Sequence, residues 1–165
     1  MHPAAKLSDL VEALEFESED LQSYFDRLSG RTVIVESSIL DAVEDEDGSL
    51  SDVPDWQKDE VEIARAIASD DGVRFIAAPD KFEFNEYQHM ERFIESVATA
   101  ESAGQLAQAI RGSGAFRRFK NALRGLGLEQ RWYQYRDEAM KQFVIEWAEN
   151  NHVAYDDDLK TGTNR

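Results

Sequence analysis

The sequence predicts an α+β fold, in which a small antiparallel sheet of about three strands is packed by several helices and the C-terminal half is all helical. Three strand-like runs lie in the first half of the chain, at Ser23–Leu28, Thr32–Glu36 and Val73–Ala77. The first two are separated by a short break containing Ser29 and Gly30, which is typical of a tight hairpin. After the third run, apolar residues recur at helical spacing. This order of elements favours a sheet covered by helices.

The first half also predicts three helices around these strands. Ser8 is a candidate N-cap for the first helix. Ser38–Val43 is a short helical stretch, and Glu44–Ser49 has the composition of a solvated loop. A third helix is expected from Asp55 to Ala68, before the stop at Asp70, Asp71 and Gly72. Its apolar side would be formed by Trp56, Val61, Ile63, Ala64 and Ile67.

The second half predicts a succession of helices divided by glycines. Asn85, with Gln88 three residues later, has the form of a capping box. Further helices are expected at Gln105–Arg111, at Ala115–Arg124 after the break Gly112–Gly114, and from Glu129 to about Asn150. We therefore expect one globular domain over residues 1–155 and a frayed polar tail over residues 156–165.

Composition restricts the class of protein. The chain has 165 residues, of which 42% are hydrophobic and 32% charged, as in folded globular proteins. It contains no cysteine, which excludes disulfides and thiolate metal sites. Neither a membrane-length apolar run nor the pattern of a secretory signal is present. We expect a cytoplasmic protein that does not enter membranes.

The formal net charge of −16 is unevenly distributed. Residues 1–100 contain 8 basic and 25 acidic side chains, whereas residues 101–165 contain 10 basic and 9 acidic ones. Within residues 111–136, seven basic side chains are accompanied by Glu129 as the only acidic one. A strongly acidic chain repels nucleic acids and anionic membranes in general, so this local excess of positive charge is the more informative feature.

Several segments resemble a bacterial family of uncharacterised proteins, family 0158. The resemblance extends over nearly the whole chain and is most specific in the segment Arg111–Lys120. It is carried by Leu10–Leu14, Tyr24–Asp26, Asp55–Gln57, Pro79–Glu83, Arg111–Lys120, Trp132–Arg136 and Ile145–Trp147. The resemblance implies an intact single domain, and it implies no activity, substrate or catalytic residue.

The basic segment supplies the candidate binding residues. On a helical wheel, Phe116, Phe119, Leu123 and Leu126 share one face, and the cations line the neighbouring face. The candidate binding residues are Arg111, Gly112, Gly114, Arg117, Arg118, Lys120, Arg124, Arg131 and Tyr133.

Two of these cations lie at a helix N-terminus, where a positive charge is unfavourable. Arg117 and Arg118 lie in the first turn of their helix, where cations are disfavoured by up to about 1 kcal/mol each. A negative group should therefore lie nearby. It is either an external anion bound by the N–H groups of Ser113–Phe116 or, as the favoured interpretation, an acidic side chain of the fold.

The long helix predicts structural ion pairs. Arg136 and Glu146 both project into its apolar arc, which consists of Trp132, Tyr135, Ala139, Met140, Phe143 and Trp147. They are ten residues and therefore about 15 Å apart along the helix, too far to pair with each other. Because an unpaired buried charge costs several kcal/mol, each needs another partner. The candidates are Asp26, Asp55 or Asp80 for Arg136, and Arg111 or Arg117 for Glu146.

Three functions from different classes remain open. The first is a non-enzymatic binding or adaptor domain that engages an anionic or acidic partner through the basic segment. The second is an acidic interaction module or nucleic-acid mimic, in which the basic residues are structural. The third is an enzyme with an unrecognised site near Asp80, Arg111 and Arg136. The histidines His2, His89 and His152 have no metal-ligand spacing, and no catalytic or phosphate-binding motif is present. We therefore assign no catalytic residue, cofactor or metal, and we disfavour nucleic acid as a partner.

Overall fold

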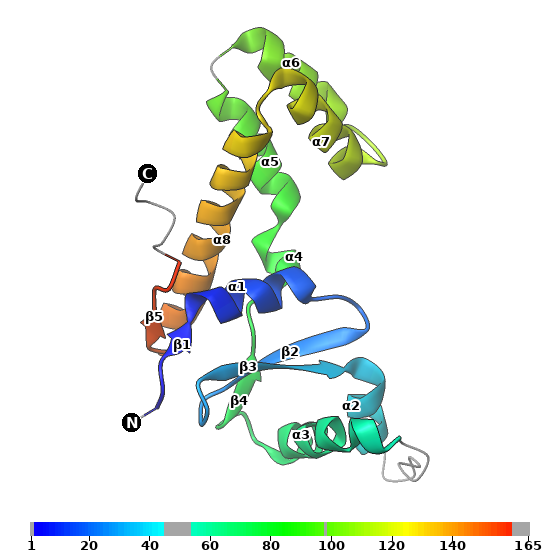
Figure 1. The fold of residues 1–165 in the computed structure, drawn as a ribbon, viewed down its shortest axis with the longest axis vertical. Coiled ribbons are helices and arrows are strands. Elements are labelled where there is room, and N and C mark those ends of the chain that lie inside the picture. Colours follow the sequence, from blue (N-terminus) through cyan, green and yellow to red (C-terminus); the bar gives the residue numbers. More distant parts are fainter. Residues whose placement is uncertain (1, 45–53, 98, 160–165) are drawn as a thin grey trace. The chain divides into compact units, whose positions relative to one another are not determined.

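Figure 1 shows a computed structural model of the chain, which describes residues 2–44, 54–97 and 99–159. The chain forms two compact units. The first consists of Met1–Lys81 with Val144–Arg165, and the second of Phe82–Phe143. Each is described by itself below, and the expectation of one domain over residues 1–155 stays a prediction.

The sheet of the first unit has the predicted three antiparallel strands. They are β2 (Leu21–Asp26), β3 (Arg31–Glu36) and β4 (Phe75–Ala77), in the order β3-β2-β4. Tyr24 on the central strand lies opposite Val33 on one side and Ala77 on the other. The α+β prediction is therefore confirmed, and the three predicted strand-like runs correspond to the three strands.

The hairpin turn between β2 and β3 requires glycine at position 30. Gly30 has a φ of +74°, and its N–H donates to the Asp26 carbonyl at 2.8 Å. A Cβ atom at this position would lie 2.7 Å from the Cβ of Pro3. The turn therefore excludes a side chain both by its backbone conformation and by the close passage of the N-terminal segment.

The first helix, α1 (Leu7–Phe16), begins one residue before the predicted cap. Lys6 occupies the N-cap position and Ser8 lies within the helix, so the prediction of Ser8 as N-cap is wrong. The free N–H of Ser8 instead donates to Asp158 Oδ1 at 2.9 Å, and its hydroxyl donates to Asp158 Oδ2. The carboxylate of a residue 150 positions away in sequence therefore caps the helix in place of a local side chain.

Asp158 is brought there by a second, two-stranded sheet. β1 (Ala5–Lys6) pairs in parallel with β5 (Tyr155–Asp156). Part of the predicted tail thus takes part in regular structure, and residues 160–165 lie outside the described residues. Apart from β5, the described residues beyond β4 form helices and their connections, in agreement with the predicted helical C-terminal half.

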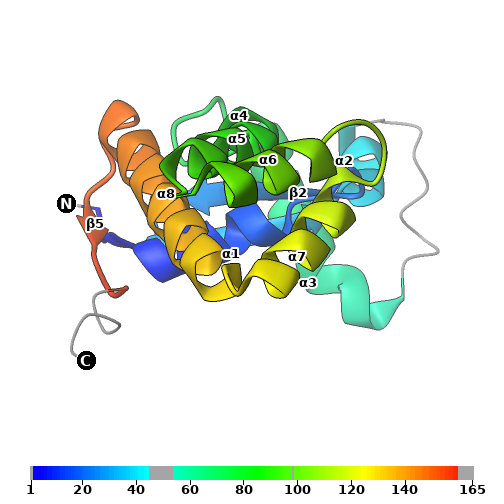
Figure 2. The ribbon, with the colours of Figure 1, turned by 90° about the horizontal axis from the view of Figure 1, so that it is seen from above.

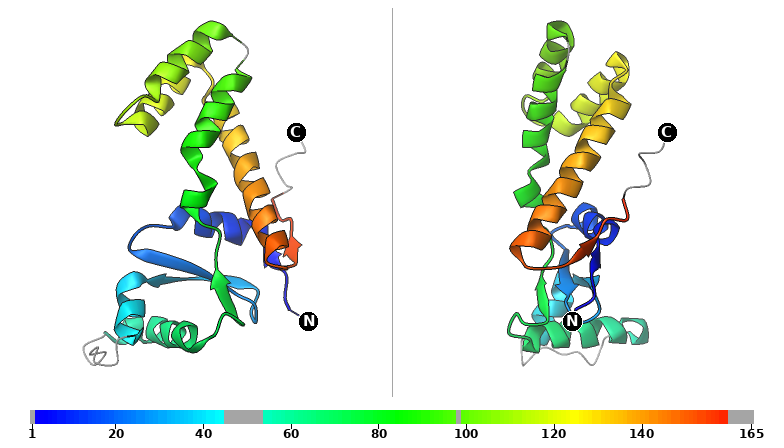
Figure 3. Two further views of the ribbon diagram at one scale, coloured as in Figure 1. Left: turned by 180° about the vertical axis from the view of Figure 1, so that it is seen from behind. Right: turned by 90° about the vertical axis from the view of Figure 1, so that its left-hand side faces the viewer.

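Two helices cover one face of the three-stranded sheet. They are α2 (Ser37–Glu44) and α3 (Lys58–Ser69), which follows the short 3-10 helix η1 (Asp55–Gln57) (Figure 3). The core beneath them consists of Val35, Ile39, Leu40, Val61 and Ala64. Residues 45–49 of the predicted acidic loop lie outside the described residues.

The prediction that Trp56 belongs to the apolar side of this helix is wrong. Its side chain is 77% exposed, because it lies in η1 and the α-helix begins only at Lys58. The apolar face of α3 therefore starts at Val61, one turn later than the sequence suggested.

The last turns of the long helix α8 (Glu129–Asn150) belong to the first unit. Val144 and Ala148 are buried there. The Trp147 indole N–H donates to the Ala77 carbonyl at 3.1 Å, and its ring meets Phe25 edge-on at 5.8 Å. These contacts join the end of α8 to the sheet.

The second unit is helical. It consists of the end of α4 (Lys81–Phe84), then α5 (Glu86–Ser96), α6 (Ala100–Ala109), α7 (Ala115–Leu126) and the first part of α8. The helices α6 and α7 run side by side (Figures 1 and 2). Their shared core contains Met90, Phe93, Ile94, Leu106, Ile110, Ala115, Phe119, Leu123 and Trp132.

Side-chain caps determine where two of these helices begin. Asn85 is the N-cap of α5, as predicted, and its Oδ1 accepts the Gln88 N–H at 3.2 Å. Thr99 caps α6 in the same way through Ser102. The predicted start of that helix at Gln105 is therefore five residues late. Among the described residues, no helix is long and apolar enough to cross a membrane.

Candidate functional site

The predicted break between α6 and α7 is a tight turn made by two glycines. Gly112 and Gly114 both have a φ of +77°, a conformation that glycine adopts without strain. Ile110 before the turn and Ala115 after it are buried, which fixes both helix ends in the core of the second unit. The turn itself is exposed at residues 111–114.

Arg118 folds back across this turn onto the end of the preceding helix. Its Nε donates to the Ala109 carbonyl at 3.0 Å, and its Nη2 donates to the Arg111 carbonyl. The last carbonyls of a helix lack intrahelical partners and carry partial negative charge. They are the negative group that the sequence requires beside Arg118, in place of the predicted external anion or acidic side chain.

The remaining candidate cations lie on the surface. Arg111, Arg117, Lys120 and Arg131 are exposed and form no ion pair with any described residue. Arg124 lies 3.3 Å from Glu129, but its side chain is 71% exposed, so the pair is screened by water. We call Arg111, Arg117, Lys120 and Arg124 on the turn and α7, together with Arg131 and Tyr133 on α8, the basic surface.

The aromatic side chains near these cations divide into buried and exposed ones. Phe119 and Trp132 are buried, whereas Phe116 is 46% and Tyr133 is 40% exposed. Phe116 was expected on one helical face with Phe119 and Leu123, and the buried side chains of α7 are Ala115, Phe119 and Leu123. Two half-exposed rings therefore lie in the segment that carries the free cations.

Of the three predicted ion-pair residues, Arg136 is paired. Its Nε lies 2.5 Å from Glu86 Oε1, and the two side chains are 21% and 19% exposed. Glu86 was not among the predicted partners of Arg136, and two of those predicted partners pair elsewhere, Asp26 with Arg74 and Asp55 with Lys58.

The other two predicted ion-pair residues, Glu146 and Asp80, differ in burial. Glu146 is exposed on α8 and does not lie beneath the apolar arc. Asp80 is partly buried in the first unit beside Glu17, whose pKa is raised by burial and by the neighbouring Asp80 carboxyl. The hypothetical enzyme site near Asp80, Arg111 and Arg136 is not assembled within either unit, since Asp80 belongs to the first and the two arginines to the second.

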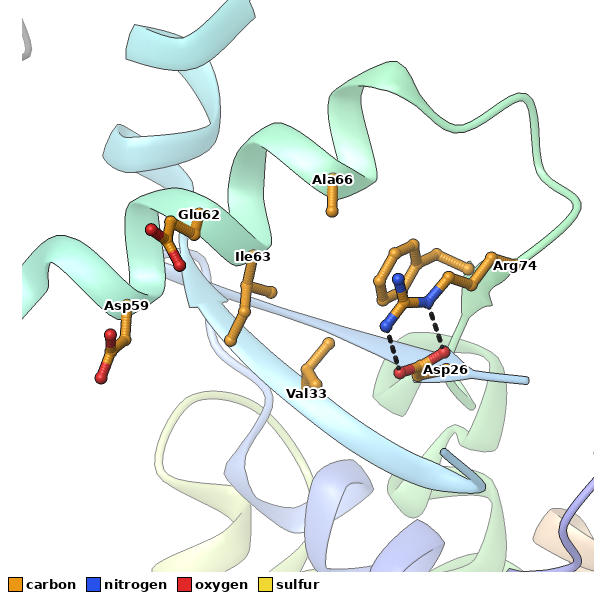
Figure 4. Close-up of a pocket in the computed structure, with 8 residues that line it drawn as sticks. Asp26, Val33, Asp59, Glu62, Ile63, Ala66 and Arg74 are labelled. Atoms are coloured by element: carbon orange, nitrogen blue, oxygen red, sulfur yellow. Dashed lines mark hydrogen bonds and ion pairs between the residues drawn. The ribbon is translucent and has the colours of Figure 1, made fainter. Parts of the chain in front are cut away.

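A pocket that the sequence did not predict lies in the first unit. It has a volume of about 460 Å³ and lies between α3 and the sheet (Figure 4). Its lining consists of Asp26, Val33, Asp59, Glu62, Ile63, Ala66, Arg74 and Phe75. The helical spacing of Asp59, Ile63 and Ala66 was visible in the sequence, but nothing there indicated which strand they face.

At one end of this pocket lies an ion pair between a buried aspartate, Asp26, and Arg74, whose side chain is 44% exposed. Asp26 is 4% exposed, and its carboxylate accepts from Arg74 Nε at 2.9 Å and from Arg74 Nη2 at 3.0 Å. The hydrogen bonds from Arg74 lower the pKa of Asp26 to about 2, with smaller contributions from Ser29 and Leu28. Asp26 is therefore an anion throughout the neutral range. Among the described residues, no group of three His, Asp or Glu side chains is placed to hold a metal ion.

Arg118 and its neighbour allow a direct test of the two roles in the basic segment. We expect Arg118→Gln to lower the free energy of unfolding by about 1 to 3 kcal/mol, because carbonyls of the turn lose charged donors. Arg117→Gln removes the same charge without removing a bond and should change stability by less than about 0.5 kcal/mol. Urea unfolding followed by circular dichroism measures both. Equal stability of the two variants would refute the capping role of Arg118.

Comparisons with known proteins give a family and no function. A family model described as "Uncharacterised protein family (UPF0158)" matches residues 3–164. A UPF0158 protein of Pseudomonas aeruginosa is 29% identical over 65 residues, which cover 39% of this chain and 42% of that protein. The chain therefore spans less than half of the length of this curated relative. No solved structure matches.

Proposed function

The chain belongs to the uncharacterised protein family UPF0158, and we propose that it is a non-enzymatic binding module that engages an anionic or acidic partner through the basic surface. The observation that supports this proposal is the set of free cations. Arg111, Arg117, Lys120 and Arg131 are exposed and have no ion-pair partner among the described residues. In a chain with 34 carboxylates, these cations pair with none of the described ones and are therefore available for a contact outside the chain.

The distribution of charge between the two units points the same way. The second unit has nine basic and eight acidic side chains, whereas the first has nine basic and 26 acidic ones. An anionic partner is repelled by the first unit and is attracted locally by the basic surface. Binding should therefore be selective for this surface and should weaken with added salt.

The exposed aromatic rings also support a role in binding, because they do not contribute to solubility. Tyr133 and Phe116 are 40% and 46% exposed, and each lies close in sequence to free cations. Tyrosine and arginine are enriched at the centres of protein interfaces, where an aromatic ring supplies area and the guanidinium supplies paired donors. The basic surface combines these two residue types.

The proposal predicts that Arg117→Gln/Lys120→Gln weakens binding of an anion by about tenfold or more. The measurement is a thermal-shift panel at low salt with phosphate, nucleotides, single-stranded RNA, duplex DNA and a polyglutamate peptide, followed by titration of each ligand that stabilises the protein. Saturation at about 100 times the dissociation constant adds about 2.7 kcal/mol of stability, which is readily detected.

A matched control removes two positive charges elsewhere. Arg65 and Arg92 are exposed on α3 and α5, so Arg65→Gln/Arg92→Gln produces the same change in net charge. The control should bind within about twofold of wild type. Absence of binding by every anion, or equal weakening in the control, would exclude the basic surface as the site.

An alternative function is supported by the arginines that form contacts within the chain. Arg118, Arg124 and Arg136 contact backbone carbonyls, Glu129 and Glu86, respectively, which is the behaviour of structural cations. In that alternative, the acidic first unit binds a basic protein or mimics nucleic acid. Binding of a polylysine peptide that is unaffected by Arg117→Gln/Lys120→Gln, together with no binding of any anion, would support this alternative.

A further inference from the structure

The pocket in the first unit shares no residue with the basic surface, which belongs to the second unit. It is a trough between α3 and the strands, with Asp59 and Glu62 toward one end and the Asp26–Arg74 pair at the other (Figure 4). Its volume of about 460 Å³ is within the range of small-molecule sites, about 300 to 1,000 Å³. The space between the ends is bordered by Val33, Ile63, Ala66 and Phe75.

The trough forms because the side of α3 that packs in the core is not the side that faces the trough. Val61 and Ala64 are buried against α2 and β3, and this contact sets the position of the helix. The adjoining side carries Ile63 and Ala66 over Val33, where the short side chain of Ala66 does not fill the space. An apolar stretch therefore remains open between two polar ends.

The charges around the trough do not balance. Asp26 is neutralised by Arg74, and both Nε and Nη2 of this arginine are occupied by that carboxylate. Asp59 and Glu62 are exposed and form no ion pair with any described residue. Two carboxylates that pair with no described cation therefore lie beside an apolar surface.

We propose that this pocket binds a small aliphatic polyamine. The ammonium groups pair with Asp59 and Glu62, and the methylene chain lies along Ile63, Ala66 and Val33. Aliphatic amines have this combination of charge and apolar length, as the lysine side chain does when its stem covers apolar surface and its ammonium stays hydrated. A carboxylate or phosphate ligand is disfavoured, because Arg74 already serves Asp26 and the remaining charges would repel an anion.

The test uses spermidine and the full chain in isothermal titration calorimetry at low salt. Asp59→Asn/Glu62→Gln removes the two charges, and Ala66→Leu fills the trough while leaving both charges in place. The control Glu19→Gln/Asp20→Asn removes two exposed negative charges from the same unit outside the pocket. Circular dichroism confirms that each variant is folded.

We expect each pocket variant to weaken spermidine binding at least tenfold and the control to weaken it less than twofold. Mg²⁺ at equal charge concentration should displace spermidine poorly, because it has no apolar chain to bury. Three results would overturn the proposal: no binding by wild type, equal weakening in the control, or unchanged binding by Ala66→Leu. None of these results bears on the basic surface, so this test and that of the proposed function are independent.

Discussion

Replacement of Asp26 by asparagine is expected to lower the free energy of unfolding by about 2 to 3 kcal/mol at pH 7, because a buried acceptor loses hydrogen bonds from a charged donor. The Asp26 carboxylate is 4% exposed and joins three segments of the first unit. It accepts two hydrogen bonds from Arg74, one from the Leu28 N–H at 2.9 Å and one from the Ser29 hydroxyl at 2.9 Å. Asparagine retains one acceptor oxygen but turns an amide group toward the guanidinium, so the bidentate pair is lost.

The same residue gives a defined pH dependence. The pKa of Asp26 is lowered from 3.8 to about 2, so the folded state binds its proton less readily than the unfolded state. This difference corresponds to about 2 kcal/mol of stability that is present above pH 4 and is lost as the pH falls toward 2. Urea unfolding of wild type and Asp26→Asn at several pH values measures it. The difference between the two proteins should shrink between pH 5 and pH 2, and a constant difference would contradict this account.

An exposed ion pair in the same unit is the matched control. Asp55 lies 2.9 Å from Lys58, but their side chains are 93% and 69% exposed. Exposed pairs contribute little because water screens them. Asp55→Asn should therefore change the unfolding free energy by less than about 0.5 kcal/mol and should show no comparable dependence on pH.

The elements that sequence analysis found are those whose signals are local. The β-branched residues of Thr32–Glu36 and the glycines at 112 and 114 act on their own backbone, and the structure has a strand and a turn at these places. The start of α6 was missed because residues 100–104 contain small and polar side chains without apolar periodicity, so only the Thr99 cap marks it.

The features that sequence analysis missed depend on contacts between distant residues. Asp158 replaces the expected cap at Ser8 from 150 residues away, and Arg74 meets Asp26 across 48 residues. Helical spacing places Asp59 and Ile63 on one face, but it does not say that the face lies over Val33 and leaves a pocket. The basic segment is visible in the composition, whereas the different roles of Arg118 and Arg117 depend on hydrogen bonds across the turn.

Trp132 is expected to be the most important single side chain of the second unit. It is 2% exposed, and its ring lies 5.0 Å from Phe119 and 5.4 Å from Phe93, both nearly edge-on. Such aromatic contacts add to the energy of burial. We expect Trp132→Ala to lower the free energy of unfolding by about 3 to 5 kcal/mol, because the cavity that it leaves cannot close fully. Urea unfolding followed by far-ultraviolet circular dichroism measures the loss without relying on the fluorescence of the removed ring.

Substitution of the neighbouring Tyr133 distinguishes an effect on stability from an effect on binding. Its side chain is 40% exposed because it lies one helical position away from the buried face that Trp132 occupies. Tyr133→Ala should therefore change the unfolding free energy by less than about 1 kcal/mol, but it should weaken any anionic partner of the basic surface several-fold by removing aromatic contact area. If Tyr133→Ala destabilises the protein as much as Trp132→Ala, its ring belongs to the core. If it leaves both stability and binding unchanged, the partner does not reach this part of α8, and the basic surface must be limited to the turn and α7.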